Sequence, residues 1–277
     1  MKQYSIAFNF YKSILFLSFI AFAMIEIRPF LKNYIITPVY CFLFALLSVS
    51  WMPLQEQKNS DNTAQEVSLP CFVLKNSPKE DISSLYTSLK LQQKGLSKKA
   101  FEYACKGYRL LLKKKIISKQ GYLAICDFSQ SSNNKRLYLV DMVNGEVLLN
   151  TYVAHGRNSG GEYATRFSNR PKSLQSSLGF YVTQDTYYGE HGLSLRIRGV
   201  EEGYNDKAGR RRIVVHGANY LGNAWLEQNN YMGRSYGCPA IPDKESDYLI
   251  NTIKKGSCLF IYHPSKNYLK GSKILNG

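Results

Sequence analysis

The chain has 277 residues and a formal net charge of +16. This length is sufficient for one large domain or two small ones with a sizeable core. A charge of this size indicates an acidic partner, such as nucleic acid, an anionic membrane or an acidic polymer. Apart from residues 113–115 and 210–212 the basic residues are scattered, which argues against a dedicated nucleic-acid-binding stripe.

Two apolar segments open the chain. Residues 13–25 carry no charge and have the length of a signal-peptide core, whereas the uncharged residues 33–55 are long enough to cross a bilayer. We predict that residues 1–53 form a signal peptide or a membrane anchor. Translation from Met24, with cleavage near Ser50, would make the second segment the signal. Whether these residues form a signal peptide or a membrane anchor, we expect the rest of the chain to be exported, to the periplasm or the outer face of the cytoplasmic membrane.

A polar linker and a helical segment follow. Residues 54–79 are polar and contain prolines, which is typical of a linker. The next residues have apolar positions every three to four residues, which predicts helices over about 80–93 and 97–115. Ser97 is the expected N-cap of the second helix. We therefore predict a short helical segment at residues 80–118.

The rest of the chain, residues 119–277, has the composition of a mainly β domain. Strands are predicted at YLAICDF, RLYLVDM, EVLLNTYVAH, GFYVTQ, LSLRIRGV, RRIVVHG and SCLFIYH. Asn144-Gly145 predicts a two-residue hairpin, because both positions tolerate positive φ. One late helix over 245–255 is expected to end at Gly256. The pattern as a whole predicts an α+β fold.

The cysteines suggest one reactive thiol rather than a metal site. The chain has six cysteines and no C-x-x-C pair, which argues against a zinc knuckle. Cys126 and Cys258 fall in predicted strands, where buried free thiols are the expected state. Cys41 lies in an apolar segment, so the soluble part contains an odd number of cysteines. A cysteine that is left without a disulfide partner in an exported protein is a candidate reactive group.

Three histidines are each followed by glycine: His155, His191 and His216. Glycine after a strand-ending histidine lets the backbone turn and leaves the ring at the rim of a sheet. We therefore predict that the three histidines share a cleft. No H-E-x-x-H motif or well-placed carboxylate completes a ligand set with them, so neither a metal nor a cofactor is predicted.

Cys238 lies in the motif GRSYGCPAI, at residues 233–241. Gly237 permits a tight turn, in which backbone N–H groups would point at the developing oxyanion of an acyl-transfer reaction. Arg234 adds positive potential, which lowers a thiol pKa. The motif predicts either a nucleophilic cysteine paired with a histidine or a small buried cysteine in a glycine-rich turn.

The stretch HGAN…GRSYGCPAI resembles the H-G…S-x-G-C signature of L,D-transpeptidases, which have the YkuD-like fold. SSLGFYV is similar to a strand motif of that family, and the nearest likeness is to murein L,D-transpeptidase catalytic domain proteins. That branch is matched by DFSQSSNNKRLYLVD, VAHGRNSG, FSNRPKS, YGEHGLSL and GRSYGCPA. The resemblance covers residues 121–264 and implies a β-sandwich or barrel-like catalytic domain.

The resemblance also implies roles for four residues. Cys238 matches the nucleophile and His216 the base. Ser235 matches the motif serine, which helps to orient the histidine. Gly237 falls in the turn that forms the oxyanion site.

Two positions depart from the family pattern. Many members have histidine where this chain has Tyr236, and arginine or asparagine where it has Ala240. The carboxylate-binding role of that later arginine is unfilled, and Arg234 is the predicted substitute. Tyr236, His191 and His155 complete the set of predicted substrate-binding residues.

The resemblance implies acyl transfer on peptidoglycan stem peptides, without a cofactor. The cysteine would form a thioester, which an amine of a second stem resolves into a 3–3 cross-link. Two alternatives remain open, an L,D-carboxypeptidase in which water resolves the thioester and a non-catalytic cell-wall-binding module.

Overall fold

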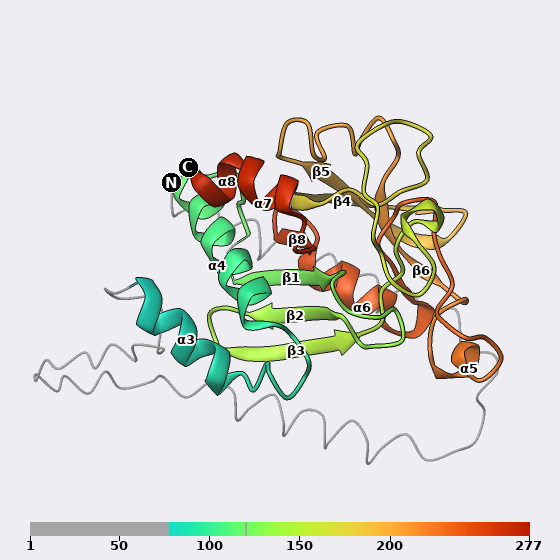
Figure 1. Ribbon diagram of the computed structural model, residues 1–277, viewed down its shortest axis with the longest axis horizontal. Coiled ribbons are helices and arrows are strands. Elements are labelled where there is room, and N and C mark those ends of the chain that lie inside the picture. The colour runs from blue at the N-terminus through green and yellow to red at the C-terminus, as the bar shows by residue number, and fades with distance from the viewer. Residues whose placement is uncertain (1–77, 120) are drawn as a thin grey trace, which may run out of the picture. The chain divides into compact units, whose positions relative to one another are not determined.

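The computed structural model describes residues 78–119 and 121–277, and eight strands of this part form one sheet in the order β3-β2-β1-β8-β4-β5-β6-β7 (Figure 1). The strands are β1 (Tyr122–Asp127), β2 (Leu137–Asp141), β3 (Glu146–Thr151), β4 (Gly179–Gly189), β5 (Gly192–Gly199), β6 (Val214–Ala218), β7 (Ala240–Pro242) and β8 (Cys258–Tyr262). The predicted export segment and residues 54–77 of the predicted linker lie outside the described residues, whereas its last two residues, Pro78 and Lys79, belong to α3. Within the described residues, no helix has the length and apolar character needed to cross a membrane.

The sheet curls into a nearly closed, barrel-like arrangement. Its two edge strands are β3 and β7. Ala154, which lies just after β3, forms an antiparallel bridge with Ala240 of β7, and the Ala154 N–H donates to the Ala240 carbonyl at 2.8 Å. The chain beyond β3 therefore comes within hydrogen-bond distance of the opposite edge. The predicted mainly β architecture is confirmed.

Six α-helices and one 3₁₀ helix of the described chain accompany the sheet. They are α3 (Pro78–Ser88), α4 (Lys98–Lys113), η1 (Arg157–Ser159), α5 (Asn223–Leu226), α6 (Asp243–Ile253), α7 (Lys266–Gly271) and α8 (Lys273–Asn276). α4 begins as predicted, because the Ser97 hydroxyl accepts the Ala100 N–H at 3.1 Å and caps the helix.

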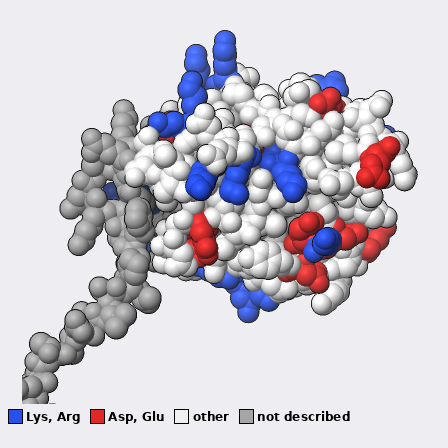
Figure 2. Space-filling model, turned by 90° about the horizontal axis from the view of Figure 1, so that it is seen from below, with Lys and Arg blue, Asp and Glu red and all other residues white. Residues whose placement is uncertain are grey.

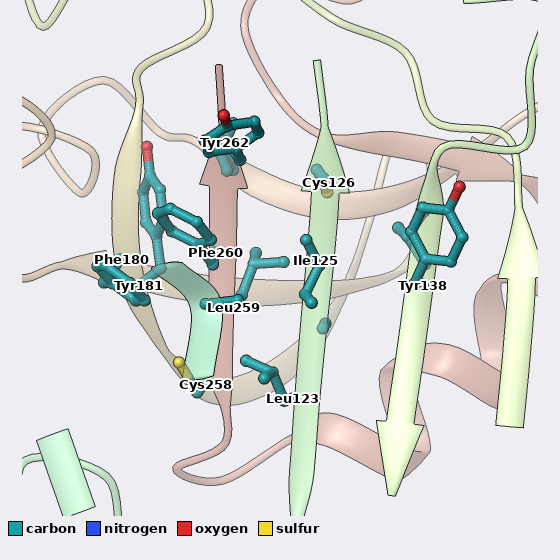
Figure 3. Packing of buried hydrophobic residues seen from close by; sticks show 14 of the residues in the cluster. Leu123, Ile125, Cys126, Tyr138, Phe180, Tyr181, Cys258, Leu259, Phe260 and Tyr262 are labelled. Carbon is teal, nitrogen blue, oxygen red and sulfur yellow. The ribbon is translucent and has the colours of Figure 1, made fainter. Parts of the chain in front are cut away.

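The predicted helical segment shares the hydrophobic core of the sheet. α4 packs against β1 and β8, and it buries residues at helical spacing, namely Ala100, Phe101, Ala104, Cys105, Gly107, Tyr108 and Leu111 (Figure 1). In the same core the rings of Phe180 and Phe260 stack with their centroids 4.1 Å apart, and Figure 3 shows them beside Leu259. The helices at the start of the described chain are thus an integral part of the β domain.

Several local features differ from the sequence-based expectations. α3 ends at Ser88 rather than near residue 93, and α5, α7 and α8 were not predicted. β2 and β3 are joined by four residues rather than two, and the Asp141 carboxylate accepts the N–H groups of Val143 and Asn144 at 2.8 and 3.0 Å. Gly145 alone in this loop has a positive φ. β7 was not predicted, because its three residues are too few to produce a strand pattern.

Charged side chains are unevenly distributed on the surface. Figure 2 shows Lys and Arg gathered near the centre of one face, with most Asp and Glu toward one side. Among the described residues a single ion pair forms, between Lys273 and Glu202 at 3.9 Å, and both side chains are exposed. Most of the basic excess is therefore available to attract an anionic polymer.

Candidate active site

A cavity of ≈ 1170 Å³ contains both Cys238 and His216. Its walls come from η1, the end of β4, the β4–β5 turn, β5, the loop before β6, β6 and the segment between β6 and β7. The lining includes Arg157, Tyr187, Glu190, His191, Ser194, Arg211, Arg212, Tyr220, Trp225, Tyr231, Arg234, Ser235 and Tyr236. A cavity of this size is suited to a peptide-sized ligand. The predicted nucleophile and base thus open onto one space.

Cys238 lies between a glycine turn and β7, and its side chain is half-buried. The Val214 N–H donates to Sγ at 3.5 Å, and the thiol donates to the Arg212 carbonyl at 3.9 Å. Burial raises the pKa of the Cys238 thiol, while the Val214 N–H and the charge of Arg211 lower it by less. The thiol is therefore protonated near neutral pH, and a nucleophilic role requires a base.

His216 lies in the middle of β6, opposite Ser194 of β5 and Ala240 of β7. Its Nδ1 is 2.7 Å from the Gly217 carbonyl. Because a carbonyl oxygen only accepts, Nδ1 carries the proton and the neutral ring has its lone pair on Nε2. Burial lowers the pKa of His216, so the imidazole is neutral near neutral pH and able to accept a proton.

The register of β6 and β7 brings the two groups together. His216 pairs with Ala240, which is two residues after Cys238. Among the described residues no hydrogen bond joins the thiol to the imidazole. Catalytic hydrogen bonds are often long before substrate binds, so the lack of a hydrogen bond between the thiol and the imidazole is compatible with a nucleophile–base pair.

His191 stacks on His216. The two ring centroids are 4.3 Å apart and the rings are inclined by 18°. His191 is exposed in the β4–β5 turn and lines the cavity. Its charge is one of the factors that lower the pKa of His216, after the larger effect of burial. The structure therefore places His191 against the predicted base.

Ser235 supports the turn rather than the histidine. Its hydroxyl donates to the Cys238 carbonyl at 2.6 Å and accepts the Gly237 N–H at 3.0 Å. The role of orienting His216, which the resemblance implied, is therefore not the one seen here, since the Gly217 carbonyl holds that ring. The Gly237 N–H is likewise engaged, which leaves the N–H groups of Tyr236 and Cys238 as the candidate oxyanion donors of the turn.

His155 is fully buried and does not line the cavity. Its Nδ1 is 2.8 Å from Nη2 of Arg136, and its Nε2 is 3.3 Å from the Gly160 carbonyl. Burial, followed by the charge of Arg136, lowers the pKa of His155 to about 3. The His155 carbonyl accepts the Ser235 N–H at 3.0 Å. His155 is thus a structural support of the motif, which corrects the predicted substrate-binding role and the prediction that three histidines share a cleft.

Arg234 and Tyr236 are exposed at the cavity wall. The Arg234 guanidinium donates to the Gly160 carbonyl at 3.1 Å and lies over the Tyr231 ring, 5.1 Å from its centroid. Tyr236 lies under the guanidinium of Arg157, at 5.9 Å. Both predicted substrate-binding residues are therefore accessible from the cavity.

Sequence reasoning missed most of the cationic lining. Arg157, Arg211 and Arg212 join Arg234 at the wall, against the single acid Glu190. The basic residues 210–212 were the available signal in the sequence. They lie far from the Cys238 motif in the chain, so the sequence did not indicate that Arg211 and Arg212 lie beside Cys238 in the fold. Within the described part of the chain, no three His, Cys, Asp or Glu side chains are arranged to hold a metal ion. The lining of the cavity favours an anionic ligand.

A protein-family model described as L,D-transpeptidase catalytic domain matches residues 92–262. The chain therefore belongs to the L,D-transpeptidase catalytic domain family. The match begins before α4 and ends with β8, so it includes the helix that packs on the sheet. No curated protein matches the sequence.

Solved structures with a similar fold are L,D-transpeptidases at low sequence identity. The enzyme from Mycobacterium smegmatis is 13% identical, with a TM-score of 0.31, over 52% of this chain and 59% of that one. The Enterococcus faecium protein is 12% identical, with a TM-score of 0.32, over 52% and 50%. The Xylanimonas cellulosilytica protein is 14% identical, with a TM-score of 0.29, over 64% and 93%. The matched region spans less than two thirds of the first two proteins, and the family assignment rests on the family model.

Proposed function

We propose that this protein is a peptidoglycan L,D-transpeptidase with Cys238 as nucleophile and His216 as general base. The observation that carries the proposal is the shared cavity, in which a protonated thiol and a neutral imidazole with a free Nε2 lone pair meet a cationic wall. The family assignment supports acyl transfer as the reaction class. A binding module would need neither the thiol nor the unprotonated ring.

The first half-reaction forms a thioester with a tetrapeptide stem. Nε2 of His216 takes the proton of Cys238 as Sγ attacks the carbonyl carbon between the third residue and the terminal D-Ala. The carbonyl electron pair moves onto oxygen, where the N–H groups of Tyr236 and Cys238 stabilise it. When the oxyanion collapses, the C–N bond breaks and the leaving D-Ala amine takes the proton from Nε2.

The second half-reaction decides the product. An amine of a neighbouring stem gives a proton to His216 and attacks the thioester. The C–S bond then breaks and the sulfur of Cys238 recovers the proton. The product is a 3–3 cross-link. If water replaces the amine, the same steps release a tripeptide stem, and the protein is an L,D-carboxypeptidase.

The positive charge of the cavity wall is complementary to the negative charge of the stem-peptide carboxylates. We assign one of these carboxylates to Arg234, because a guanidinium binds a carboxylate through two parallel hydrogen bonds and this one is exposed at the wall. Peptidoglycan lies outside the cytoplasmic membrane, so the proposal includes export. Residues 1–53, as signal peptide or membrane anchor, would provide it, and the linker at residues 54–79 would follow them.

The proposal is tested with the purified full-length protein and disaccharide-tetrapeptide muropeptides, with products identified by mass spectrometry. We expect cross-linked or tripeptide products from the unmodified protein, a loss of at least about a thousandfold in Cys238→Ala, and a comparable loss in His216→Ala. Tyr188→Ala is the control, because Tyr188 is 83% exposed and does not line the cavity. Full turnover in Cys238→Ala would refute the nucleophile, and binding without products would favour the wall-binding module.

A further inference from the structure

The side chain of Arg211 is clamped beside the turn that carries Cys238. Its guanidinium donates four hydrogen bonds to the segment 168–177, whose acceptors are the Ser168 carbonyl, the Ser177 hydroxyl, the Ser173 hydroxyl and the Gln175 carbonyl. The two of these bonds made by Nη2 are 3.2 and 2.5 Å long. These contacts hold the charged group in one place, although it lies at the wall of an open cavity.

The clamped guanidinium lies against the residue before the nucleophile. A Cβ atom on Gly237 would be 3.2 Å from Nη2 of Arg211 and 2.8 Å from the Gln175 carbonyl. Gly237 has φ +121°, a conformation that favours glycine. Any larger residue here would displace the arginine or its support. The turn and the guanidinium are therefore packed together.

Among the described residues, the charge of Arg211 has no carboxylate partner. All four acceptors of its hydrogen bonds are neutral, and the single ion pair of the described chain joins Lys273 to Glu202. Burial lowers the pKa of Arg211. A guanidinium nevertheless carries its charge at neutral pH. A fixed cation that opens onto the same cavity as a thiol interacts most favourably with that thiol when it is ionised.

We infer that the Arg211 guanidinium stabilises the thiolate form of Cys238 electrostatically. Arg211 is a positioning residue, since it acts on the reacting sulfur through space and supports the turn that presents it. The inference rests on the proposed role of Cys238 as nucleophile. It explains how a half-buried thiol, whose ionisation burial disfavours, becomes reactive enough to attack a carbonyl once His216 removes its proton.

The test measures the rate at which iodoacetamide alkylates Cys238 in the full-length protein, as a function of pH, by mass spectrometry of the peptide that contains it. We expect Arg211→Gln to move the midpoint of this profile to higher pH and to slow alkylation near neutral pH by roughly threefold to tenfold. Arg211→Lys keeps the charge and is expected to stay closer to the unmodified protein. The other titratable and charged groups that line the cavity of Cys238 are unchanged in these variants; they are Arg157, Tyr187, Glu190, His191, Arg212, His216, Tyr220, Tyr231, Arg234 and Tyr236.

Two controls separate charge from structure. Arg210→Gln removes a neighbouring exposed arginine that does not line the cavity, and we expect the profile to stay in place. Ser173→Ala loosens the clamp and keeps the charge, so it reports the effect of loosening alone, even if Arg211→Gln fails to fold. An unchanged profile in Arg211→Gln would overturn the inference, as would equal shifts in Arg211→Gln, Arg211→Lys and Ser173→Ala. Alkylation needs no peptidoglycan, so this result is independent of whether the protein catalyses transpeptidation.

Discussion

The stacked rings of His191 and His216 place two titratable groups 4.3 Å apart at the proposed base. A charge on His191 at this distance disfavours protonation of His216. Asp243 acts in the opposite sense, because its charge raises the pKa of His216. Burial is the largest factor and lowers the pKa of His216, although the hydrogen bond to Gly217 and the charge of Asp243 raise it. The proposed base is therefore neutral at the pH where it must accept a proton.

Replacing His191 should shift the pH dependence of the reaction. His191→Phe keeps an aromatic ring against His216 and removes the charge that lowers its pKa, so the pKa of His216 rises. The base is active when neutral, so we expect the acidic limb of the kcat/KM profile to move to higher pH by up to about one unit. NMR titration of His216 gives the same pKa without turnover. Tyr188→Ala should leave the acidic limb of the kcat/KM profile in place. An acidic limb at unchanged or lower pH in His191→Phe would show that the charge of His191 does not lower the pKa of His216.

At the scale of elements, the approach of α4 to the sheet depends on the missing side chain of Gly107. A Cβ atom there would be 2.0 Å from the Phe180 ring. That ring is fully buried and stacked on Phe260 at 4.1 Å, so it has little room to move. The glycine therefore permits a helix–sheet contact that any other residue would disturb.

Gly107→Ala should destabilise the protein even though alanine is the better helix former. The helix preference for alanine is worth about 1 kcal/mol, whereas overpacking of a rigid core costs about 1–3 kcal/mol, and the severe overlap places this site at the upper end. We expect the midpoint of thermal unfolding, followed by circular dichroism, to fall by several degrees. Gly209→Ala is the matched control, since a Cβ there meets nothing within 4 Å. Equal or higher stability of Gly107→Ala would contradict the packing argument.

At the scale of the whole described unit, Glu201 connects the C-terminal helices to the sheet. Its buried carboxylate accepts the Phe180 N–H of β4 at 2.7 Å, the Tyr268 hydroxyl of α7 at 2.8 Å and the Ser272 hydroxyl. Burial raises the pKa of Glu201, and these hydrogen bonds limit the rise. The carboxylate thus depends on donors from two distant parts of the chain.

Tyr268→Phe removes one of these donors and should lower the free energy of unfolding by about 1–3 kcal/mol at neutral pH. The pKa of Glu201 in the folded protein then rises further above its unfolded value, so stability is lost as pH rises through that pKa. The difference in free energy of unfolding between Tyr268→Phe and the unmodified protein should therefore be smaller at pH values below the ordinary pKa of glutamate. Denaturant unfolding at two pH values measures both effects. Tyr204→Phe, which removes an exposed hydrogen bond to Asn267, should have little effect, and equal losses in the two variants would argue against the Glu201 network.

The elements that sequence patterns predicted are those with strong local causes. The α4 helix begins at Ser97 because a serine hydroxyl can cap a helix, and β1 and β8 are runs of apolar residues that fit the centre of a sheet. The family was indicated by several motifs together, among them HGAN, GRSYGCPAI and SSLGFYV, and no single one of them was sufficient. Each of these signals lies within a few neighbouring residues, where propensity and hydrogen-bonding chemistry act directly.

What the sequence by itself determined was therefore the family, most of the strands and the candidate nucleophile and base. Only the tertiary structure decided which other residues join them. Three His-Gly pairs look alike in sequence, yet folding stacks His191 on His216, the proposed base, and buries His155 against Arg136. Arg211 reaches the Cys238 turn because a separate loop clamps it there. These outcomes depend on contacts between segments distant in the chain, and no local propensity encodes which distant segment a side chain will meet.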